Sequence, residues 1–283
     1  MAASFPSHRV VSHSLGDTEF LVLTDGTGSF DHSLFPETKP AAIENLLAAS
    51  GESTLRTNFN AFLIRWPGCT VLVDAGPRER FGPDSGHLPE ALREAGTAPE
   101  EVDLVFLTHL HPDHAAGTVD AEGRALFPQA EMVVPELEVR TWSDPAPFAG
   151  NETLARSQQL AASVLAAYRD RLRTTAGEAE IAPGLTQMPL PGHTPGHSGF
   201  RLEADGGTVV HAGDIVHAPF LQLADPEIAI AFDMDRAEAR VARRRMLDLL
   251  AHEGCLCTGG HFLQPALGRV EASGRGYRFQ PEA

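Results

Sequence analysis

The sequence predicts a mixed α/β domain in which layers of sheet and helix alternate. In the first half, two strands within residues 9–25 precede a helix at 39–49 and a hairpin over 60–74. The second half repeats the alternation, with a hairpin over 200–211 and a long helix after Asp235. Such an order is typical of layered α/β folds. Since no linker rich in Gly, Ser or Pro interrupts the 283 residues, we expect a single domain over 1–283.

The elements of the first half follow from local patterns. Residues 20–23 are an apolar strand leading into the Gly-rich stretch 25–30, which we expect to be a turn. The hairpin is punctuated by Pro67 and Gly68. A short helix is expected at 87–95, and the apolar run 102–107 predicts a buried strand.

In the second half, residues 140–150 carry prolines and aromatic residues and are expected to be a loop. Asn151 suits the N-cap of a helix that we expect to reach about residue 173. Asp235 and Glu238 resemble a capping box at the start of the last helix. Further short strands are expected at 131–134, 185–190 and 254–258.

Composition excludes several kinds of partner. The formal charge of −16 argues against electrostatic binding of nucleic acid or of an anionic membrane. No run approaches the roughly 18 apolar residues of a membrane span, and residues 1–9 lack the apolar core of a signal peptide. Three cysteines are too few for a disulfide framework. We therefore expect a cytoplasmic protein acting on a small molecule.

Four potential metal ligands follow the strand at 102–107. His109, His111, Asp113 and His114 stand directly after it, at a strand end where side chains converge without burying a charge in the sheet. Imidazole and carboxylate ligands suit borderline metals such as zinc. The alternative is a polar loop that happens to be rich in histidine.

Three later residues share this context. His193, Asp214 and His261 each follow an apolar strand and stand beside glycine, which permits tight turns and close backbone approach. Together with the first cluster they make seven candidate ligands. A pair of divalent ions ~3.5–4 Å apart can share a hydroxide and bring the pKa of a bound water towards ~7.

The order and types of these seven residues resemble the metallo-β-lactamase superfamily over residues 60–262. The resemblance implies a four-layer αββα sandwich with a two-metal centre at one edge between the sheets. It assigns one metal to His109, His111 and His193, the other to Asp113, His114 and His261, and a bridging role to Asp214. The cofactors expected are two divalent ions, zinc first, with iron, manganese or cobalt as alternatives.

The same resemblance implies hydrolysis through a metal-bridging hydroxide, with Asp113 and Asp214 as the catalytic residues and Asp113 carrying the proton. Neutral imidazole ligands need acceptors behind them to fix their tautomers. Asp74 and Thr108, at neighbouring strand ends, are the candidates, with a purely structural role as the alternative.

Within the superfamily, the closer resemblance is to the methyl parathion hydrolase and lactonase branch. It is carried by residues 24–27, by 213–217 with its continuation through 225–233, and by the ending 261–278. Acyl-homoserine lactonases have a tyrosine three residues after the bridging Asp, where this chain has His217. The difference favours the methyl parathion hydrolase side. The substrate expected is a lactone, an aryl ester or a phosphotriester.

Two other functions share much of this ligand set. A glyoxalase II-like thioesterase would bind glutathione through basic residues that are not evident in the tail at 275–279. A non-hydrolytic, iron-binding redox member of the fold would have a carboxylate where this chain has His111, and a flavin domain besides.

Aromatic residues in the expected loops are candidates for the substrate pocket, with ordinary packing as the alternative for each. These pocket candidates are Phe30, Trp142, Phe148, His217 and Phe220. His217 could instead support a ligand or simply pack, and we expect His197 to be a hydrogen-bonded structural residue. The resemblance also implies a homodimer.

Overall fold

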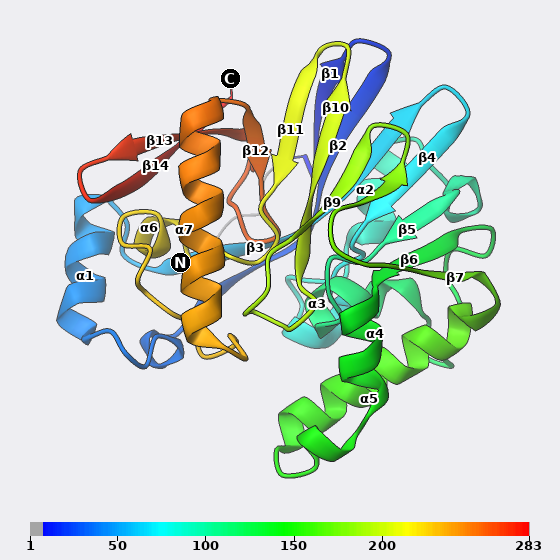
Figure 1. Ribbon diagram of the computed structural model, residues 1–283, viewed down its shortest axis with the longest axis horizontal. Coiled ribbons are helices and arrows are strands. Elements are labelled where there is room, and N and C mark those ends of the chain that lie inside the picture. The colour runs from blue at the N-terminus through cyan, green and yellow to red at the C-terminus, as the bar shows by residue number, and fades with distance from the viewer. Residues whose placement is uncertain (1–7, 283) are drawn as a thin grey trace.

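Two seven-stranded sheets face each other in the computed structural model, which describes residues 8–282. Each half of the chain builds one sheet, and helices lie on the outside of the sandwich (Figure 1). The first sheet contains β1 (Val10–Leu15), β2 (Thr18–Phe30), β3 (Leu55–Trp66), β4 (Cys69–Val73), β5 (Leu104–Phe106), β6 (Glu131–Pro135) and β7 (Leu172–Thr175) in that order. The second contains β8 (Ala179–Ala182), β9 (Leu185–Pro189), β10 (Ser198–Ala204), β11 (Gly207–His211), β12 (Leu256–Thr258), β13 (Gly268–Ser273) and β14 (Gly276–Pro281).

Both sheets are mixed. Strands β1 to β4 are antiparallel and β4 to β7 parallel, while β11 and β12 form the parallel pair of the second sheet. The helices are α1 (Pro40–Ala49), α2 (Leu88–Glu94), α3 (Pro112–Ala115), α4 (Glu136–Ser143), α5 (Glu152–Tyr168), α6 (Pro219–Gln222) and α7 (Arg236–Glu253). The parallel strands leave room for loops at their carboxyl ends, and these loops carry most of the candidate ligands.

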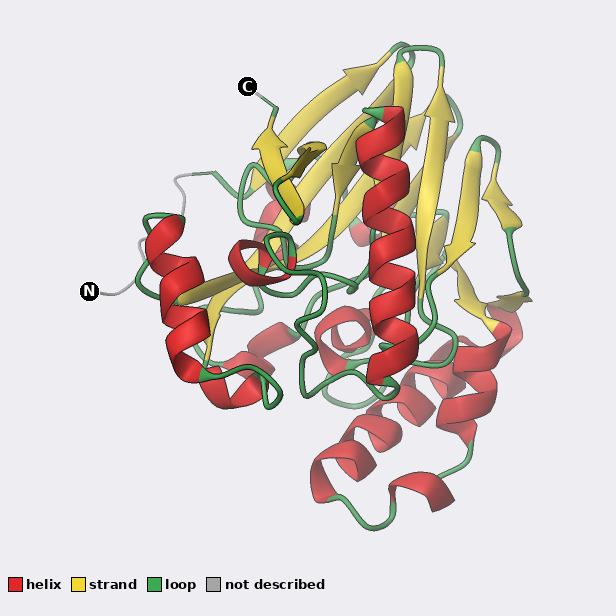
Figure 2. Ribbon diagram, turned by 60° about the vertical axis from the view of Figure 1, so that its left-hand side comes forward, coloured by secondary structure: helices red, strands yellow, loops and turns green. Residues whose placement is uncertain are grey.

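The period of two in the strands divides the core into two layers. In β2, Phe20 and Val22 face the second sheet, while Leu21 and Leu23 pack on the opposite side against the helices. Phe62 and Phe200 join Phe20 between the sheets, with ring centroids 5.9–6.4 Å apart. Figure 2 shows the long helix α7 running along the strands from the outside, where its buried Leu247 and Leu250 join the same core. The predicted αββα sandwich is confirmed.

Several local predictions are confirmed by the caps. The Asn151 side chain accepts a hydrogen bond from the amide of Leu154 and begins α5, and the Asp235 side chain accepts one from Glu238 and begins α7. The hairpins β3–β4 and β10–β11 also lie where the sequence predicts them.

Within residues 8–282 no helix is long and apolar enough to cross a membrane.

Three local predictions are wrong. Residues 25–30 continue β2 rather than turning, because a register shift between Thr24 and Gly26 keeps the stretch paired with β3. Residues 140–143 belong to α4, not to a loop. Helix α5 ends at Tyr168, since the chain must return to pair β7 with β6 at the sheet edge. The sequence did not predict the edge strands β7, β8 and β14, or β13 beside β14, because these short strands at the sheet margins have little apolar alternation of their own.

Candidate metal centre

All seven candidate ligands meet at one edge of the sandwich. His109 and His111 follow β5, and Asp113 and His114 lie in α3. His193 lies in the loop between β9 and β10, Asp214 follows β11 and His261 follows β12. Parallel neighbours such as β11 and β12 end at the same edge, so residues 47 apart in sequence come together.

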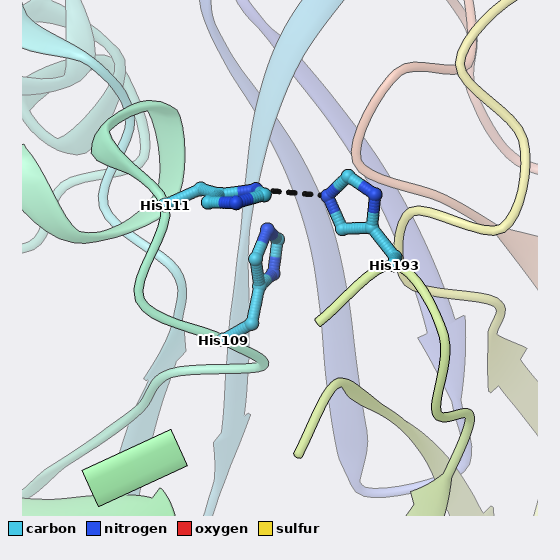
Figure 3. A group of neighbouring side chains, drawn as sticks. All are labelled: His109, His111 and His193. Atoms are coloured by element: carbon cyan, nitrogen blue, oxygen red, sulfur yellow. Dashed lines mark hydrogen bonds between the residues drawn. The ribbon is translucent and has the colours of Figure 1, made fainter. Parts of the chain in front are cut away.

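The first group of ligands consists of three histidines (Figure 3). His109, His111 and His193 have ring nitrogens within 4.8 Å of one another, and the three rings point towards a common centre. Nδ1 of His111 lies 2.9 Å from Nε2 of His193. Burial lowers the pKa values of His109 and His111 well below their usual range. Both imidazoles are therefore neutral at pH ~7, the form in which histidine binds metals.

The second group mixes carboxylates and imidazoles: Asp113, His114, Asp214 and His261. Oδ2 of Asp214 lies 3.0 Å from Nε2 of His114 and 2.9 Å from Nε2 of His261. Asp113 is the most exposed of the four, and its Oδ2 lies 3.4 Å from Nε2 of His261. This donor set is that of a borderline divalent metal.

Asp214 belongs to both groups. The same Oδ2 atom lies 3.8 Å from Nε2 of His109 and 3.7 Å from Nε2 of His193. With Nε2 of His217 at 3.4 Å, five imidazole nitrogens surround one carboxylate oxygen. Nε2 of His109 and Oδ1 of Asp214 are buried and have no hydrogen-bond partner among the described residues. An unpaired buried polar atom costs about 1–3 kcal/mol, and bound cations would satisfy these atoms. The residues therefore fit two divalent metal ions.

The charges of the site point the same way. Although burial opposes it, the carboxylates of Asp214 and Asp113 raise the pKa of His114 well above its usual value. Asp214 likewise raises the pKa of His261 against the effect of burial. In return, although burial raises it, His114 and His261 hold the pKa of Asp214 well below its usual range. Protons on His114 and His261 thus balance the negative charge of the buried carboxylates. Bound divalent ions could supply this positive charge instead.

Acceptors behind four of the five candidate histidines turn Nε2 towards the centre. Nδ1 of His114 donates to Oδ2 of Asp74 at 2.8 Å, and Nδ1 of His193 to Oδ1 of Asp233 at 3.1 Å. Such contacts fix the tautomer and orientation of a ligand. Asp74 thus lies where the sequence predicted an acceptor. Asp233 was not predicted in this role, because its position before α7 is set by the fold and not by any spacing.

His109 and His261 are held in the same way. The Thr108 hydroxyl donates to Asp74 and lies 3.1 Å from Nδ1 of His109, so that it accepts from this ring nitrogen. Nδ1 of His261 donates to the carbonyl of Asn58 at 3.0 Å. Thr108 therefore has the supporting place that the sequence predicted, whereas nothing in the sequence pointed to Asn58.

His197 supports the site without belonging to it. Its Nδ1 donates to the carbonyl of Leu190 at 2.6 Å, and its Nε2 accepts from the amide of Asp214 at 2.8 Å. Burial lowers the pKa of His197 to about 3, which keeps it neutral and able to accept. This is the hydrogen-bonded structural role predicted from the sequence.

Glycine lets the backbone approach the ligands closely. A Cβ atom at Gly260 would lie 2.5 Å from Oδ1 of Asp214 and 3.0 Å from the ring of His114. A Cβ at Gly213, whose φ is +55°, would lie 2.4 Å from Nε2 of His197. Neither position has room for a side chain, in agreement with the prediction that glycine beside the ligands permits a crowded site.

His217 lies inside the cluster. Its Nε2 is 3.4 Å from Oδ2 of Asp214, its ring stacks on that of His261 at 4.7 Å, and its Nδ1 is buried without a partner among residues 8–282. It forms a third group with His193 and Asp214. Burial lowers the pKa of His217 to about 4, so the ring is neutral at pH ~7.

The aromatic pocket candidates separate into two sets. The ring of Phe30 lies 6.1 Å from that of His261 and 6.4 Å from that of His217, and Phe220 packs in the same small apolar cluster as Phe30. Trp142 and Phe148 instead stack on each other in the core, only 0% and 2% exposed. Trp142 lies in α4, with its ring centroid 5.6 Å from that of His111. Neither Trp142 nor Phe148 therefore stands in the open loop that the sequence predicted.

Three aromatic residues near the site were not predicted. Phe59 lies 5.9 Å from the ring of His261 and contacts Phe81, and Phe232 lies 6.1 Å from Phe30. Phe81 is 52% exposed and Phe232 41% exposed, although phenylalanine is among the residues most often fully buried. Phe59 is hidden from sequence reasoning because it lies within a strand. The exposure of the other two depends on how their loops fold.

An αββα sandwich with two adjoining His/Asp groups at its edge defines a metal-binding protein of the metallo-hydrolase type. The family model of the metallo-beta-lactamase superfamily matches residues 57–261. The chain belongs to this superfamily, as the sequence motifs predicted.

Similar proteins agree with this assignment. The chain is 29% identical over 173 residues to the N-acyl homoserine lactonase AiiB of Agrobacterium fabrum, covering 52% of this chain and 59% of that protein. It is 23% identical over 171 residues to the N-acyl homoserine lactonase AiiA of Bacillus thuringiensis subsp. kurstaki, covering 57% of this chain and 60% of that one. The matched part thus spans about 60% of the length of these curated relatives.

Solved structures match over nearly the whole chain. The hydrolase AbOPH of the beta lactamase superfamily is 28% identical, with a TM-score of 0.92 and 99% of both chains covered. AidC, a dizinc quorum-quenching lactonase, is 23% identical, with a TM-score of 0.91 and 97% of both chains covered. Because AidC is only 23% identical, its likeness shows that the two chains share a fold.

Proposed function

We propose that the chain is a binuclear metal-dependent hydrolase that opens lactones or cleaves related esters of small molecules. One observation carries the proposal: a single oxygen of Asp214 lies within 2.9–3.8 Å of imidazole nitrogens from both ligand groups. A carboxylate in this place suits a shared ligand of two ions. The lactonases and hydrolases among the similar proteins support the same chemistry.

The proposed division of the ligands follows the order of the motifs. His109, His111 and His193 would hold one ion, Asp113, His114 and His261 the other, and Asp214 both. Bound there, two divalent ions would supply Lewis acidity and lower the pKa of water towards ~7, which provides a nucleophile. Nitrogen and oxygen ligands in these numbers suit zinc, with iron, manganese and cobalt as alternatives.

The side chains of the site divide the remaining work. Although burial raises it, the neighbouring His114 and His261 hold the pKa of Asp113 below its usual range. Asp113 is therefore a carboxylate at pH ~7. Its side chain is 17% exposed, against 1% for Asp214, which supports assigning to Asp113 the role of accepting a proton from the nucleophile and passing it to the leaving group.

The rim favours an apolar, uncharged substrate. The ring centroids of Phe30, Phe59 and Phe232 lie 5.9–6.1 Å from those of His261 or His217, within the range of aromatic contacts. Pockets for small ligands typically combine apolar walls with a few polar groups that fix the orientation of the ligand. The names of the similar proteins do not favour the thioesterase or the iron redox alternative.

The test joins metal analysis to a hydrolysis screen over lactones, aryl esters and phosphotriesters. We expect about two metal ions per chain and turnover of at least one class, and both are lost together in the double variant His111→Ala, Asp214→Ala. His252→Ala, which removes an exposed histidine at the end of α7, is the matched control and keeps both. Activity retained by a metal-free double variant would overturn the mechanism.

A further inference from the structure

Glu138 is a fully buried carboxylate that sequence reasoning did not single out. It lies in the first turn of α4 and is 0% exposed. Its Oε2 accepts from the amide of Leu110 at 3.0 Å and from the indole of Trp142 at 2.9 Å. Its Oε1 accepts from the hydroxyl of Thr194 at 2.5 Å and from the amide of Gly196 at 2.9 Å.

Three of these four donors belong to the segments that carry the first ligand group. Leu110 stands between His109 and His111, and Thr194 and Gly196 follow His193. One segment comes from the first half of the chain and the other from the second, and each leaves a different sheet. The Glu138 carboxylate is therefore a direct polar link between the loops that must converge to form the three-histidine group.

The surroundings of Glu138 are specific for a carboxylate. Its two oxygens offer about four acceptor sites, and four donors occupy them. Glutamine could not replace it without turning an NH₂ group towards two buried donors. Packing is equally tight, because a Cβ atom at Gly196 would lie 2.5 Å from the backbone nitrogen of Glu138. Burial raises the pKa of Glu138 above its usual value, although its four hydrogen-bond donors offset part of this rise.

Stability alone does not account for this arrangement. A buried charge is often no more stabilising than an apolar side chain of similar volume, and the surrounding core offers apolar neighbours such as Trp142 and Leu110. What the carboxylate adds is geometry, since it ties the two loops together beside the histidines, in addition to the backbone bond from the amide of Ser198 to the carbonyl of Thr108.

We propose that Glu138 is the positioning residue of the three-histidine group: it holds His109, His111 and His193 at metal-binding distance by hydrogen-bonding both of their loops. This inference rests on the proposed function, because it assumes that the three histidines bind an ion. Its consequence is selective. The His114 and His261 side chains have no hydrogen bond to Glu138 and are held by Asp74 and Asn58, so the second group should depend on Glu138 much less.

The experiment uses Glu138→Gln and measures zinc affinity by competition with a chromophoric chelator. A residue that hydrogen-bonds to a metal ligand typically contributes about 10–100-fold to metal affinity. We expect one of the two zinc equivalents to weaken by about that factor and the other to remain within about threefold. Unchanged affinity for both ions, or an equal loss at both, would overturn the proposal.

Two backgrounds identify the affected ion. In His261→Ala only the three-histidine group is complete, and adding Glu138→Gln should weaken the remaining ion about 10–100-fold. In His109→Ala the second group is intact, and the same addition should leave the remaining ion unaffected. The reverse pattern contradicts the assignment. A wild-type chain that binds fewer than two ions would instead contradict the proposed function.

Two further variants separate positioning from folding. Gln158→Leu removes the 2.9 Å bond from Nε2 of Gln158 to the carbonyl of Trp142, another buried contact of α4 that does not reach the ligand loops. It should lower the unfolding midpoint while leaving both zinc affinities unchanged. If Glu138→Gln does not fold, Thr194→Val removes one donor at nearly constant volume and should weaken the same single ion by a smaller factor. Wild-type zinc affinity in Thr194→Val would then count against the proposal.

Discussion

Nδ1 of His114 lies 2.8 Å from Oδ2 of Asp74, while Nε2 of the same ring lies 3.0 Å from Oδ2 of Asp214. The imidazole is therefore held between an acceptor that is 0% exposed and the carboxylate at the centre of the site. Asp74 also accepts from both the amide and the hydroxyl of Thr108. A ligand fixed on both sides in this way has one orientation available to it.

Replacing this acceptor should weaken metal binding. Asp74→Asn cannot accept simultaneously from His114 and from both groups of Thr108, so the ring loses its fixed tautomer. We expect zinc affinity to fall about 10–100-fold, mostly at the ion held by His114, as measured by chelator competition. Asp103→Asn, an exposed aspartate beside the opposite end of β5, should bind zinc like the wild type. Equal affinities in the two variants would contradict a supporting role for Asp74.

His217 is expected to act on the substrate rather than to hold a metal. Its unpartnered Nδ1 is a buried acceptor beside Asp214, and its low pKa keeps it neutral. In His217→Ala we expect kcat to fall roughly 100-fold, the lower end of general acid–base effects, with two zinc ions still bound. Steady-state kinetics on the best substrate, combined with metal analysis, test this. Loss of one ion would show instead that His217 is a ligand, as its grouping with His193 and Asp214 allows.

That the seven candidate ligands would meet at one edge could be predicted from the sequence because each signal is local. An apolar strand that ends in a histidine or aspartate beside glycine is visible in one dimension, and the sheet then brings such ends together. Glu138 and Asp233 could not be found in this way. Glu138 sits in a helix that resembles a loop in sequence, and its four partners lie 4 to 58 residues away. The role of such a residue depends on which loops the tertiary structure brings to it.

The same reasoning explains the error at Trp142. Its segment is rich in proline and aromatic residues, which favours a loop, yet the indole donates to Glu138 one helical turn earlier and packs on Phe148. Tertiary burial therefore decided the local structure here, as it often does where intrinsic helix propensity is weak.

Arg243 is expected to be a strong stability determinant. It is 0% exposed in α7, donates to the carbonyls of Ile215 and Pro226, and brings Nη2 within 3.6 Å of Oδ2 of Asp233. Arg243→Met would leave the Asp233 carboxylate buried with less compensation. Breaking such a pair costs about 3–5 kcal/mol, which urea unfolding of the metal-free protein can measure. Arg245→Met, exposed on the same helix, should stay within about 0.5 kcal/mol of wild type. If Arg243→Met also lost no more than about 0.5 kcal/mol of unfolding free energy, the prediction would be contradicted.

Asp25 should make stability depend on pH away from the metal site. It is 1% exposed, and its carboxylate accepts from the amides of Gly86 and Leu88 at the start of α2. Burial raises its pKa from the usual 3.8 to about 6. Because the folded state holds this proton more tightly than the unfolded state, the contribution of Asp25 is fully present below about pH 4 and is lost as the pH rises through about 6.

The comparison that isolates this effect is with Asp25→Asn, which does not titrate. The wild type should lose about 3 kcal/mol relative to the variant between about pH 4 and about pH 7, since each pKa unit corresponds to about 1.4 kcal/mol. Urea unfolding of the metal-free proteins at several pH values measures the difference. At low pH the wild type should be the more stable, because its protonated carboxyl group still accepts from the helix while asparagine turns an NH₂ group towards one of the two amides. A stability difference that stays constant with pH, or that grows in favour of the wild type as the pH rises, would show that folding does not raise the pKa of the Asp25 carboxyl and would contradict the prediction.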